Sequence, residues 1–290
     1  MRKFIENSKY VIIVSALFIL IGIGSMIFRG GLNFGIDFRG GTQVVIDFGK
    51  EFDSAEAVEI AKKYSDSAVV NTLEKTQLEI KSKQMGSENV SAMFNEIKEA
   101  YDLGDEALVS EDEIGASVGK ELTRNSLISL GIAIIGMLIY VAIRFEFDFG
   151  VAAIVALVHD VLITIAVFAI FNIPINTPFI ASVLIIVGYS INDTIVVFDR
   201  IRENIKKMRS SSPEEVANIS ISQTLARSIN TSITTLITIV ALYIFVPTVR
   251  DFAFPLIVCI VSGAYSSIFV ASPVWCAIKN KKRAKKIKTA

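Results

Sequence analysis

Six long apolar segments are the feature that most constrains how this chain can fold. They lie near residues 11–28, 125–143, 151–172, 178–198, 226–246 and 252–277. Each approaches or exceeds the roughly 20 residues that a helix needs to cross the hydrocarbon core of a bilayer. Hydrophobic residues make up 52% of the chain, which is more than is usual in a soluble domain. The sequence therefore predicts an α-helical, polytopic membrane protein with six transmembrane helices.

Charged residues are distributed unequally between the two sides that this topology creates. Residues 29–124 contain 19 acidic and 11 basic residues, whereas the rest of the chain contains 10 acidic and 18 basic residues. Basic residues concentrate before the first apolar segment, between the fourth and the fifth, and after the sixth. Because cytoplasmic loops are enriched in Lys and Arg, both termini are predicted to be cytoplasmic and residues 29–124 to lie outside.

The topology divides the chain into four parts. Residues 1–28 form the cytoplasmic N-terminus and the first span, which we expect to remain uncleaved because no small-residue cleavage site follows it. Residues 29–124 form the extracytoplasmic domain. Residues 125–278 hold the other five spans, with a cytoplasmic loop at 199–225, and residues 279–290 form a basic cytoplasmic tail.

Strand and helix patterns alternate within the outer domain. Strand-like runs and helix-like runs occupy, in chain order, residues 42–48, 53–64, 68–73, 77–83, 87–100 and 107–110. The order β-α-β-β-α-β predicts a small α+β, ferredoxin-like domain, whose first helix opens on a capping box at Asp53 and Glu56. On the cytoplasmic side, Ser212 and Pro213 predict the start of a helix that runs along the membrane surface into the fifth span.

Ionisable residues inside the spans call for an explanation, because a charge at the centre of a spanning helix costs at least ~2.5–3.5 kcal/mol. Asp193 lies six residues before Asp199, which marks the predicted cytoplasmic end. At a rise of about 1.5 Å per residue it is roughly 9 Å inside the membrane, too deep for a short side chain to reach water. Ser190 and Asn192 flank it.

Polar residues in the fifth span recur at helical spacing. They are Arg227, Asn230, Thr231, Thr234, Thr235 and Thr238. This spacing places the polar side chains in one stripe along the helix, as expected for a helix that lines a hydrated, proton-conducting path. An aspartate near an arginine can change partners when a proton arrives, so Asp193 and Arg227 are the leading pair. A static buried network that sets helix packing is the alternative.

Two further polar features have weaker functional interpretations. Asp160, in the third span, is either a pathway member or a structural polar contact, and it is expected to share no helix face with the adjacent His159. In the sixth span, small residues from Cys259 to Ser267 predict a close contact between helices.

Motifs of enzymatic catalysis are absent from the sequence, and residues 115–120 (GASVGK) lack the spacing of a phosphate-binding loop. We therefore predict no enzymatic activity, no cofactor and no metal, and an ion gradient as the energy source.

Two long motifs resemble the SecD/SecF family of bacterial protein-export proteins. Residues 31–42 (GLNFGIDFRGGT) are similar to the glycine segment that follows the first helix of these proteins, and residues 187–204 (VGYSINDTIVVFDRIREN) to the fourth-span signature of SecF. Residues 156–160 and 223–232 are similar to the third and fifth spans. The resemblance covers nearly the whole chain.

The resemblance implies a half-sized member of the resistance-nodulation-division (RND) class in the bacterial cytoplasmic membrane. Such a protein pairs with a SecD-like subunit, associates with the SecYEG channel, and uses an H⁺ or Na⁺ gradient to drive late steps of preprotein export. Asp193 would be the conducting carboxylate and Arg227 its partner. The pathway would also include Asn192, Ser190, Thr231 and Asp160.

The glycine segment contains Gly35, Asp37, Gly40 and Gly41. Because glycine permits backbone conformations closed to other residues, we interpret it as a hinge between the first helix and the outer domain. Direct contact with the exported chain is the alternative. Two other functions remain open, an RND-type small-molecule efflux half-transporter and a passive scaffold of the translocon.

Overall fold

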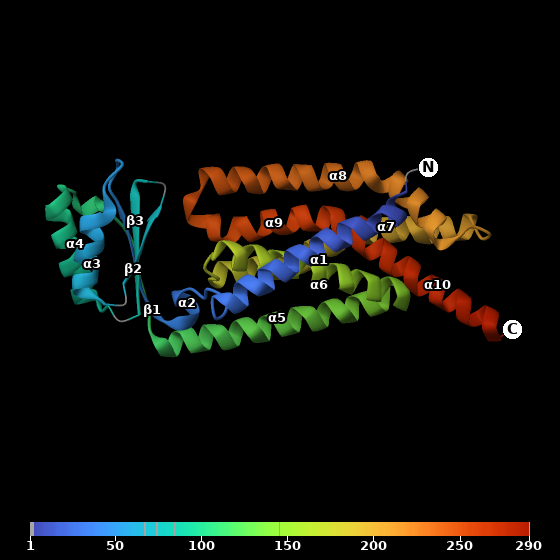
Figure 1. Cartoon of the computed structure of the whole chain (residues 1–290), viewed down its shortest axis with the longest axis horizontal. Coiled ribbons are helices and arrows are strands. Elements are labelled where there is room, and N and C mark those ends of the chain that lie inside the picture. Colours follow the sequence, from blue (N-terminus) through green and yellow to red (C-terminus); the bar gives the residue numbers. More distant parts are fainter. Residues whose placement is uncertain (1–2, 67, 74, 84, 145, 290) are drawn as a thin grey trace. The chain divides into compact units, whose positions relative to one another are not determined.

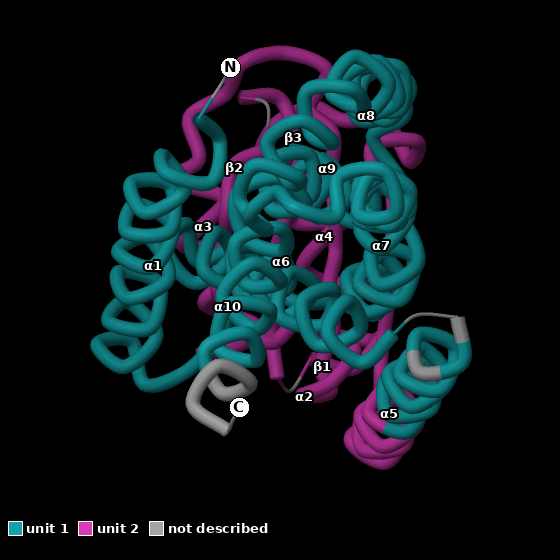
Figure 2. Tube along the Cα trace, turned by 90° about the vertical axis from the view of Figure 1, so that its right-hand side faces the viewer, with its two compact units in different colours: residues 1–33, 128–290 teal, residues 34–127 magenta. Residues whose placement is uncertain are grey.

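The computed structural model describes residues 3–289 apart from 67, 74, 84 and 145. The chain forms two compact units, which Figure 2 colours separately. Residues 1–33 and 128–290 form a helical unit, and residues 34–127 form an α+β unit. Each unit is built around its own buried side chains.

The helical unit consists of long helices joined by short connections (Figure 1). Its elements are α1 (Phe4–Phe28), the second half of α5 (Ala116–Arg144), α6 (Phe147–Phe171), α7 (Thr177–Lys207), α8 (Pro213–Phe245), η2 (Pro247–Val249), α9 (Arg250–Ser266), η3 (Ser267–Ala271) and α10 (Ser272–Thr289). Within the described residues, six helical segments are long and apolar enough to cross a membrane, the last of them running from η2 into α10. The predicted class, a mostly helical polytopic membrane protein, is confirmed.

Several helices extend well beyond the apolar segments that predict them. Helix α7 continues to Lys207 and α8 begins at Pro213, so the predicted loop at 199–225 is helical except at residues 208–212. The Ser212 hydroxyl accepts a 3.1 Å hydrogen bond from the backbone N–H of Glu215 and caps α8 as expected. The predicted surface helix and the fifth span are one uninterrupted helix of 33 residues.

Small residues let α1 approach α6 closely. A Cβ atom on Gly22 would lie 2.5 Å from the Cβ of Ala166. One turn later, the Ser25 hydroxyl donates a 2.9 Å hydrogen bond to the carbonyl of Ala169. The C-terminal part of α1 therefore lies directly against the α6 backbone.

An aromatic cluster closes the end of the bundle that holds the N-terminus. The ring of Phe149 on α6 lies 5.3 Å from the ring of Trp275 on α10 and 5.0 Å from that of Phe198 on α7. All three side chains are almost fully buried. The start of α1 lies at the same end, because the Asn218 side chain on α8 accepts from Ile5 N–H and donates to Glu6.

The sixth span is not a regular α-helix. Residues Ser267–Ala271 form a π-helical turn, η3, between α9 and α10. Turns of this kind are uncommon and often lie beside functional residues. This one begins directly after Ser266, a residue of the candidate site described below.

The α+β unit is a four-stranded antiparallel sheet with two helices. Its elements are β1 (Gly41–Asp47), α3 (Ser54–Tyr64), β2 (Val69–Leu73), β3 (Gln77–Ser82), α4 (Ser87–Tyr101), η1 (Asp105–Ala107) and β4 (Leu108–Ile114). The strand order is β2-β3-β1-β4. Alternate residues of β1, among them Val44 and Ile46, pack against apolar residues of α3 and α4. Asp53 caps α3 by accepting from Ala55 N–H at 3.0 Å.

The predicted glycine hinge is a tightly packed corner next to the short helix α2 (Ile36–Arg39), which includes Asp37. Gly40 and Gly41 have φ angles of 74° and 134°, conformations that other residues rarely adopt. A Cβ atom on Gly41 would lie 2.4 Å from the carbonyl oxygen of Ser82 on β3. Gly35 departs from the expectation, because its φ of −70° is open to any residue.

Candidate functional site

Asp160, near the middle of α6, is fully buried and accepts hydrogen bonds from three serines. The hydroxyls of Ser190, Ser262 and Ser266 lie 2.6, 2.6 and 2.8 Å from its carboxylate oxygens. Ser190 belongs to α7, and the other two belong to α9. A buried carboxylate requires such partners, because an unpaired charge inside a protein is strongly unfavourable. Asp160 is therefore the polar centre at which α6, α7 and α9 meet.

The residues around Asp160 differ from the sequence expectation in two respects. The Nδ1 atom of His159 lies 3.1 Å from Oδ1 of Asp160, so the adjacent pair does interact despite the helical angle between the residues. The small residues of the sixth span do more than permit close packing. Ser262 and Ser266 are hydrogen-bond donors, and Gly263 places the α9 backbone near Ser190.

Asp193, on α7, is the second buried carboxylate and is 4% exposed. The Ser232 hydroxyl on α8 donates a 3.1 Å hydrogen bond to its Oδ2 atom. Ser190 lies three residues earlier on the same helix and faces the same side. One turn of α7 thus carries a donor to Asp160 and the carboxylate Asp193.

The polar stripe on α8 faces outward in the single chain, and its role in lining a proton path stays a prediction. Arg227, Asn230, Thr234 and Thr238 are exposed in the single chain, and Thr231 is half-buried. The threonine hydroxyls donate to carbonyls of their own helix, as Thr231 does to Arg227 at 2.9 Å, which is common for threonine within helices. Polarity alone therefore did not indicate which face is buried.

The inner polar face of α8 is a second row of hydroxyls that sequence reasoning missed. Thr224, Ser228 and Ser232 repeat every four residues and are all buried. Their spacing was visible in the sequence, but they lie beside a longer and more polar row on the same helix. Burial against α7 distinguishes the two rows.

The Asn192 side chain lies outside the site in the single chain, whereas the charge of Arg227 acts electrostatically on the Asp193 carboxylate. Among the described residues, no ion pair or hydrogen bond joins the Arg227 guanidinium to Asp193, and the Asn192 side chain is exposed on the outer face of α7. The structure brings Asp160, Ser190 and Asp193 together. Asn192 on α7 and Arg227 on α8 are exposed.

Several buried polar atoms near the carboxylates have no hydrogen-bond partner within the described part of the chain. They are Tyr189 Oη on α7, Ser228 Oγ on α8, His159 Nε2 on α6 and Ser267 Oγ in η3. Tyr189 precedes Asp193 by one turn, and Ser228 precedes Ser232 by one turn. Each of these groups can take part in a hydrogen bond.

Two family models match the chain. The model described as protein export membrane protein SecD/SecF, C-terminal, matches residues 93–281, and the SecD/SecF GG motif matches residues 25–51. The chain belongs to the SecD/SecF family. Together with the six apolar helices, this membership makes the chain a multi-pass protein of a bacterial membrane.

Relatives named protein translocase subunit SecF resemble the chain over nearly its full length. The one from Sebaldella termitidis is 39% identical over 98% of this chain and 94% of its own. The one from Thermodesulfovibrio yellowstonii is 39% identical over 92% of each chain. These SecF proteins and the present chain are therefore of similar size.

Solved SecDF structures share the fold. The crystal structure of SecDF from Thermus thermophilus, a translocon-associated membrane protein, matches with a TM-score of 0.84 at 34% identity. The match covers 96% of this chain and 39% of the SecDF chain. A SecDF structure in a super-membrane-facing form matches with a TM-score of 0.71 and covers 40% of that chain. This SecF-like chain corresponds to less than half of a SecDF protein.

Proposed function

We propose that this chain is an accessory subunit of the Sec protein-export translocase, paired with a SecD-like subunit. Its role is to couple a transmembrane proton or sodium gradient to late steps of preprotein translocation through a SecYEG channel. The observation that carries the coupling role is the pair of buried carboxylates, Asp160 and Asp193, joined through one turn of α7. Intramembrane carboxylates of this kind are a feature of ion pathways.

Protonation of either carboxylate would rearrange its hydrogen bonds. An ionised carboxylate only accepts, whereas a protonated one also donates. Ser232 donates to Asp193 and Ser190 donates to Asp160, so a proton arriving at either carboxylate would require a hydroxyl to turn. Because Ser190 and Asp193 share one face of α7, a change at one carboxylate would be transmitted to the other through α7.

The exposed side chains of Asn192 on α7 and Arg227 on α8 support pairing with SecD. A guanidinium and an amide are costly to leave facing lipid, and half of a SecDF-like assembly leaves such faces uncovered. In the paired state Arg227 would complete the electrostatic surroundings of Asp193. The glycine corner at Gly40 and Gly41 would transmit movement between the membrane helices and the outer domain, as the hinge interpretation requires.

The distribution of basic residues supports cytoplasmic termini. Lys206, Arg209, Lys279 and Arg283 gather at the end of the bundle that holds the start of α1. Under the positive-inside rule this end is cytoplasmic, and the acidic α+β unit is outside.

The test is export of a reporter preprotein by cells that produce each variant at matched levels, with and without an uncoupler. Asp193→Asn keeps the size and much of the hydrogen bonding of the side chain but cannot titrate, so gradient-dependent stimulation of export should disappear. Asp160→Asn should reduce it as well. Asp199→Asn, a half-buried carboxylate farther along α7, is the matched control and should export normally. If Asp193→Asn exports like the parent and stays equally sensitive to the uncoupler, the chain is a passive scaffold.

A further inference from the structure

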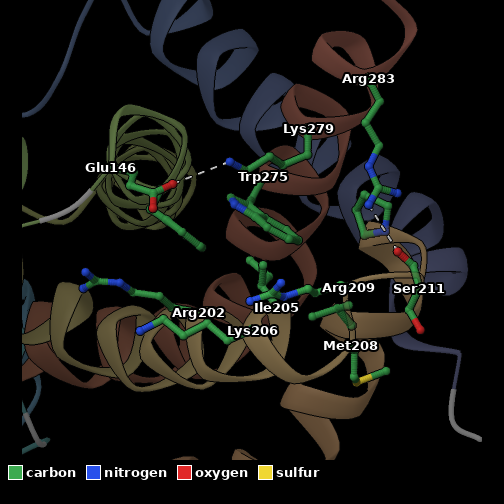
Figure 3. Close-up of a pocket in the computed structure, with 13 residues that line it drawn as sticks. Glu146, Arg202, Ile205, Lys206, Met208, Arg209, Ser211, Trp275, Lys279 and Arg283 are labelled. Atoms are coloured by element: carbon green, nitrogen blue, oxygen red, sulfur yellow. Dashed lines mark hydrogen bonds and ion pairs between the residues drawn. The ribbon is translucent and has the colours of Figure 1, made fainter. Parts of the chain in front are cut away.

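A cavity lies at the end of the helical unit where α7 ends and α8 begins, and neither Asp160 nor Asp193 lines it. Its volume is about 330 Å³, within the range of small-molecule sites. Side chains from α6, α7, α8, α10 and the connection between α7 and α8 line it (Figure 3). None of the proposed coupling residues contributes to its lining.

The lining is strongly basic. Five cationic side chains, Arg202, Lys206, Arg209, Lys279 and Arg283, face a single carboxylate, Glu146. Arg202 and Lys206 are four residues apart on α7 and therefore share one helix face, and Arg209 follows in the connection between α7 and α8. In Figure 3, Arg202 and Lys206 extend from α7 on the side of the cavity opposite Lys279.

Only part of this charge is neutralised by the protein. Lys279 lies 2.9 Å from Asp148 and 3.6 Å from Glu146, and Arg283 donates to the carbonyl of Ser211 at 3.3 Å. By contrast, no described residue forms an ion pair or hydrogen bond with the side chains of Arg202, Lys206 or Arg209. Three like charges on one wall repel each other unless an anion lies between them.

The rest of the lining is apolar and includes one unused donor. Phe149, Ile205, Met208 and Val216 contribute to the wall together with Trp275. The Trp275 side chain is 1% exposed, and its Nε1–H has no hydrogen-bond partner within the described residues. Basic groups above an apolar floor suit a ligand that is anionic at one end and apolar at the other.

We propose that this cavity binds the phosphate group of an anionic ligand, supplied by the headgroup of an anionic phospholipid. Arginine guanidinium groups bind phosphate oxygens through paired hydrogen bonds, and lysine adds point charge. Basic pockets between membrane helices are known to accept anionic lipid headgroups. Soluble inorganic phosphate has the same chemistry at its charged end but cannot use the apolar floor. The proposal is independent of the ion pathway.

The experiment measures ligand binding to the full chain purified in a neutral detergent. Native mass spectrometry counts bound phosphatidylglycerol, with phosphatidylcholine as the zwitterionic comparison and inorganic phosphate as the soluble one. The test variant is the triple substitution Arg202→Gln, Lys206→Gln and Arg209→Gln. The matched control, Lys9→Gln with Lys207→Gln and Lys281→Gln, removes the same charge from exposed positions outside the cavity.

Phosphatidylglycerol should bind the parent at least 10-fold more tightly than phosphatidylcholine. This preference should be lost in the triple variant and retained in the control. Binding of inorganic phosphate alone, with the same loss in the triple variant, would assign the phosphate site to a soluble anion. If the preference for phosphatidylglycerol is lost equally in both variants, or retained in both, the proposed site is wrong.

A charge-preserving variant keeps the proposal falsifiable if the triple variant does not fold. Arg202→Lys with Arg209→Lys retains the positive charge but loses both planar forks. Its affinity for phosphatidylglycerol should fall several-fold while the elution volume in size-exclusion chromatography stays that of the parent. Unchanged affinity would show that only diffuse charge attracts the lipid and would overturn the proposed site.

Discussion

The Ser190 hydroxyl on α7 donates a 2.6 Å hydrogen bond to Oδ2 of Asp160 on α6, three residues before the buried Asp193. One turn of α7 therefore carries both a donor to Asp160 and the second carboxylate, Asp193.

The three serines around Asp160 should make that residue important for stability as well as for function. Asp160→Ala would leave the hydroxyls of Ser190, Ser262 and Ser266 without their acceptor. Because each unsatisfied buried group costs about 1–3 kcal/mol, the free energy of unfolding should fall by about 3 kcal/mol or more. Thermal unfolding in detergent, followed by tryptophan fluorescence, measures the change.

Two milder substitutions serve as controls for this prediction. Asp160→Asn keeps one oxygen acceptor and should lower the unfolding midpoint less than Asp160→Ala does. Ser222→Ala removes an exposed hydroxyl that bonds only to its own helix and should leave the midpoint unchanged. A midpoint for Asp160→Ala equal to that of Ser222→Ala would show that the serine network adds nothing to stability.

Gly22 and Gly24 on α1 should respond in opposite directions to substitution by alanine. A Cβ atom on Gly22 would lie 2.5 Å from Ala166 on α6, whereas nothing lies within 4 Å of one on Gly24. Gly22→Ala should therefore lower the free energy of unfolding by about 1–3 kcal/mol through overpacking. Gly24→Ala should raise it by up to about 1 kcal/mol, because alanine favours helix. Similar unfolding midpoints for the two variants would argue against close packing of α1 on α6.

Alanine substitutions at Gly41 and Gly49 distinguish the energetic cost of backbone strain from the cost of steric conflict in the α+β unit. Both have positive φ, 134° and 64°, but only a Cβ atom on Gly41 meets an obstacle, the Ser82 carbonyl oxygen at 2.4 Å. Gly49→Ala should cost about 1–2 kcal/mol from strain alone. Gly41→Ala should cost about 1–3 kcal/mol more and should speed hydrogen exchange of the amides that pair β1 with β3. Equal exchange in the two variants would mean that the corner is not tightly packed.

Acid should weaken the contact between α3 and α4. Hydrogen bonds from Lys63 first, and from Tyr64, hold the pKa of Glu96 below its ordinary value. Because the folded pKa is depressed, the contact contributes stability above the unfolded pKa of Glu96 and loses it as pH falls through the folded pKa. Carbon-13 NMR of labelled glutamate in the full chain reports this titration.

Substitution at the partners of Glu96 should return its pKa toward the ordinary value. Lys63→Gln should raise it more than Tyr64→Phe does, since the lysine contributes the larger effect. Lys62→Gln removes the same charge from the neighbouring exposed position and should leave the titration almost unchanged. An equal rise in the Lys62 and Lys63 variants would attribute the shift to diffuse charge.

Much of the fold follows from local patterns, but the site depends on contacts that those patterns do not contain. The element order of the outer domain and the cap at Ser212 were predicted from nearby residues. Asp193 and Ser190 were also recognised, because a carboxylate deep in an apolar helix is costly wherever it faces. The partners Ser262 and Ser266 lie about a hundred residues from Asp160, and periodicity within one helix cannot reveal a partner on another.

The buried face of α8 could not be predicted for a similar reason. That helix carries two polar rows, one through Arg227 and Thr231 and one through Ser228 and Ser232. Both rows satisfy helical spacing, so periodicity favours whichever is longer and more polar. Only packing against α7 shows that the shorter row is buried and that Ser232 contacts Asp193.

The π-helical turn at Ser267–Ala271 changes the direction in which side chains point around the helix axis within a single span. It accommodates one residue more than an α-helical turn would, and one residue corresponds to a rotation of about 100° around the helix axis. Before it, α9 directs Ser262 and Ser266 toward Asp160; after it, α10 directs Trp275 and Lys279 toward the basic cavity. Deleting one residue from the turn would restore uniform α-helical phase, and the serines and the tryptophan could then no longer both face their present partners.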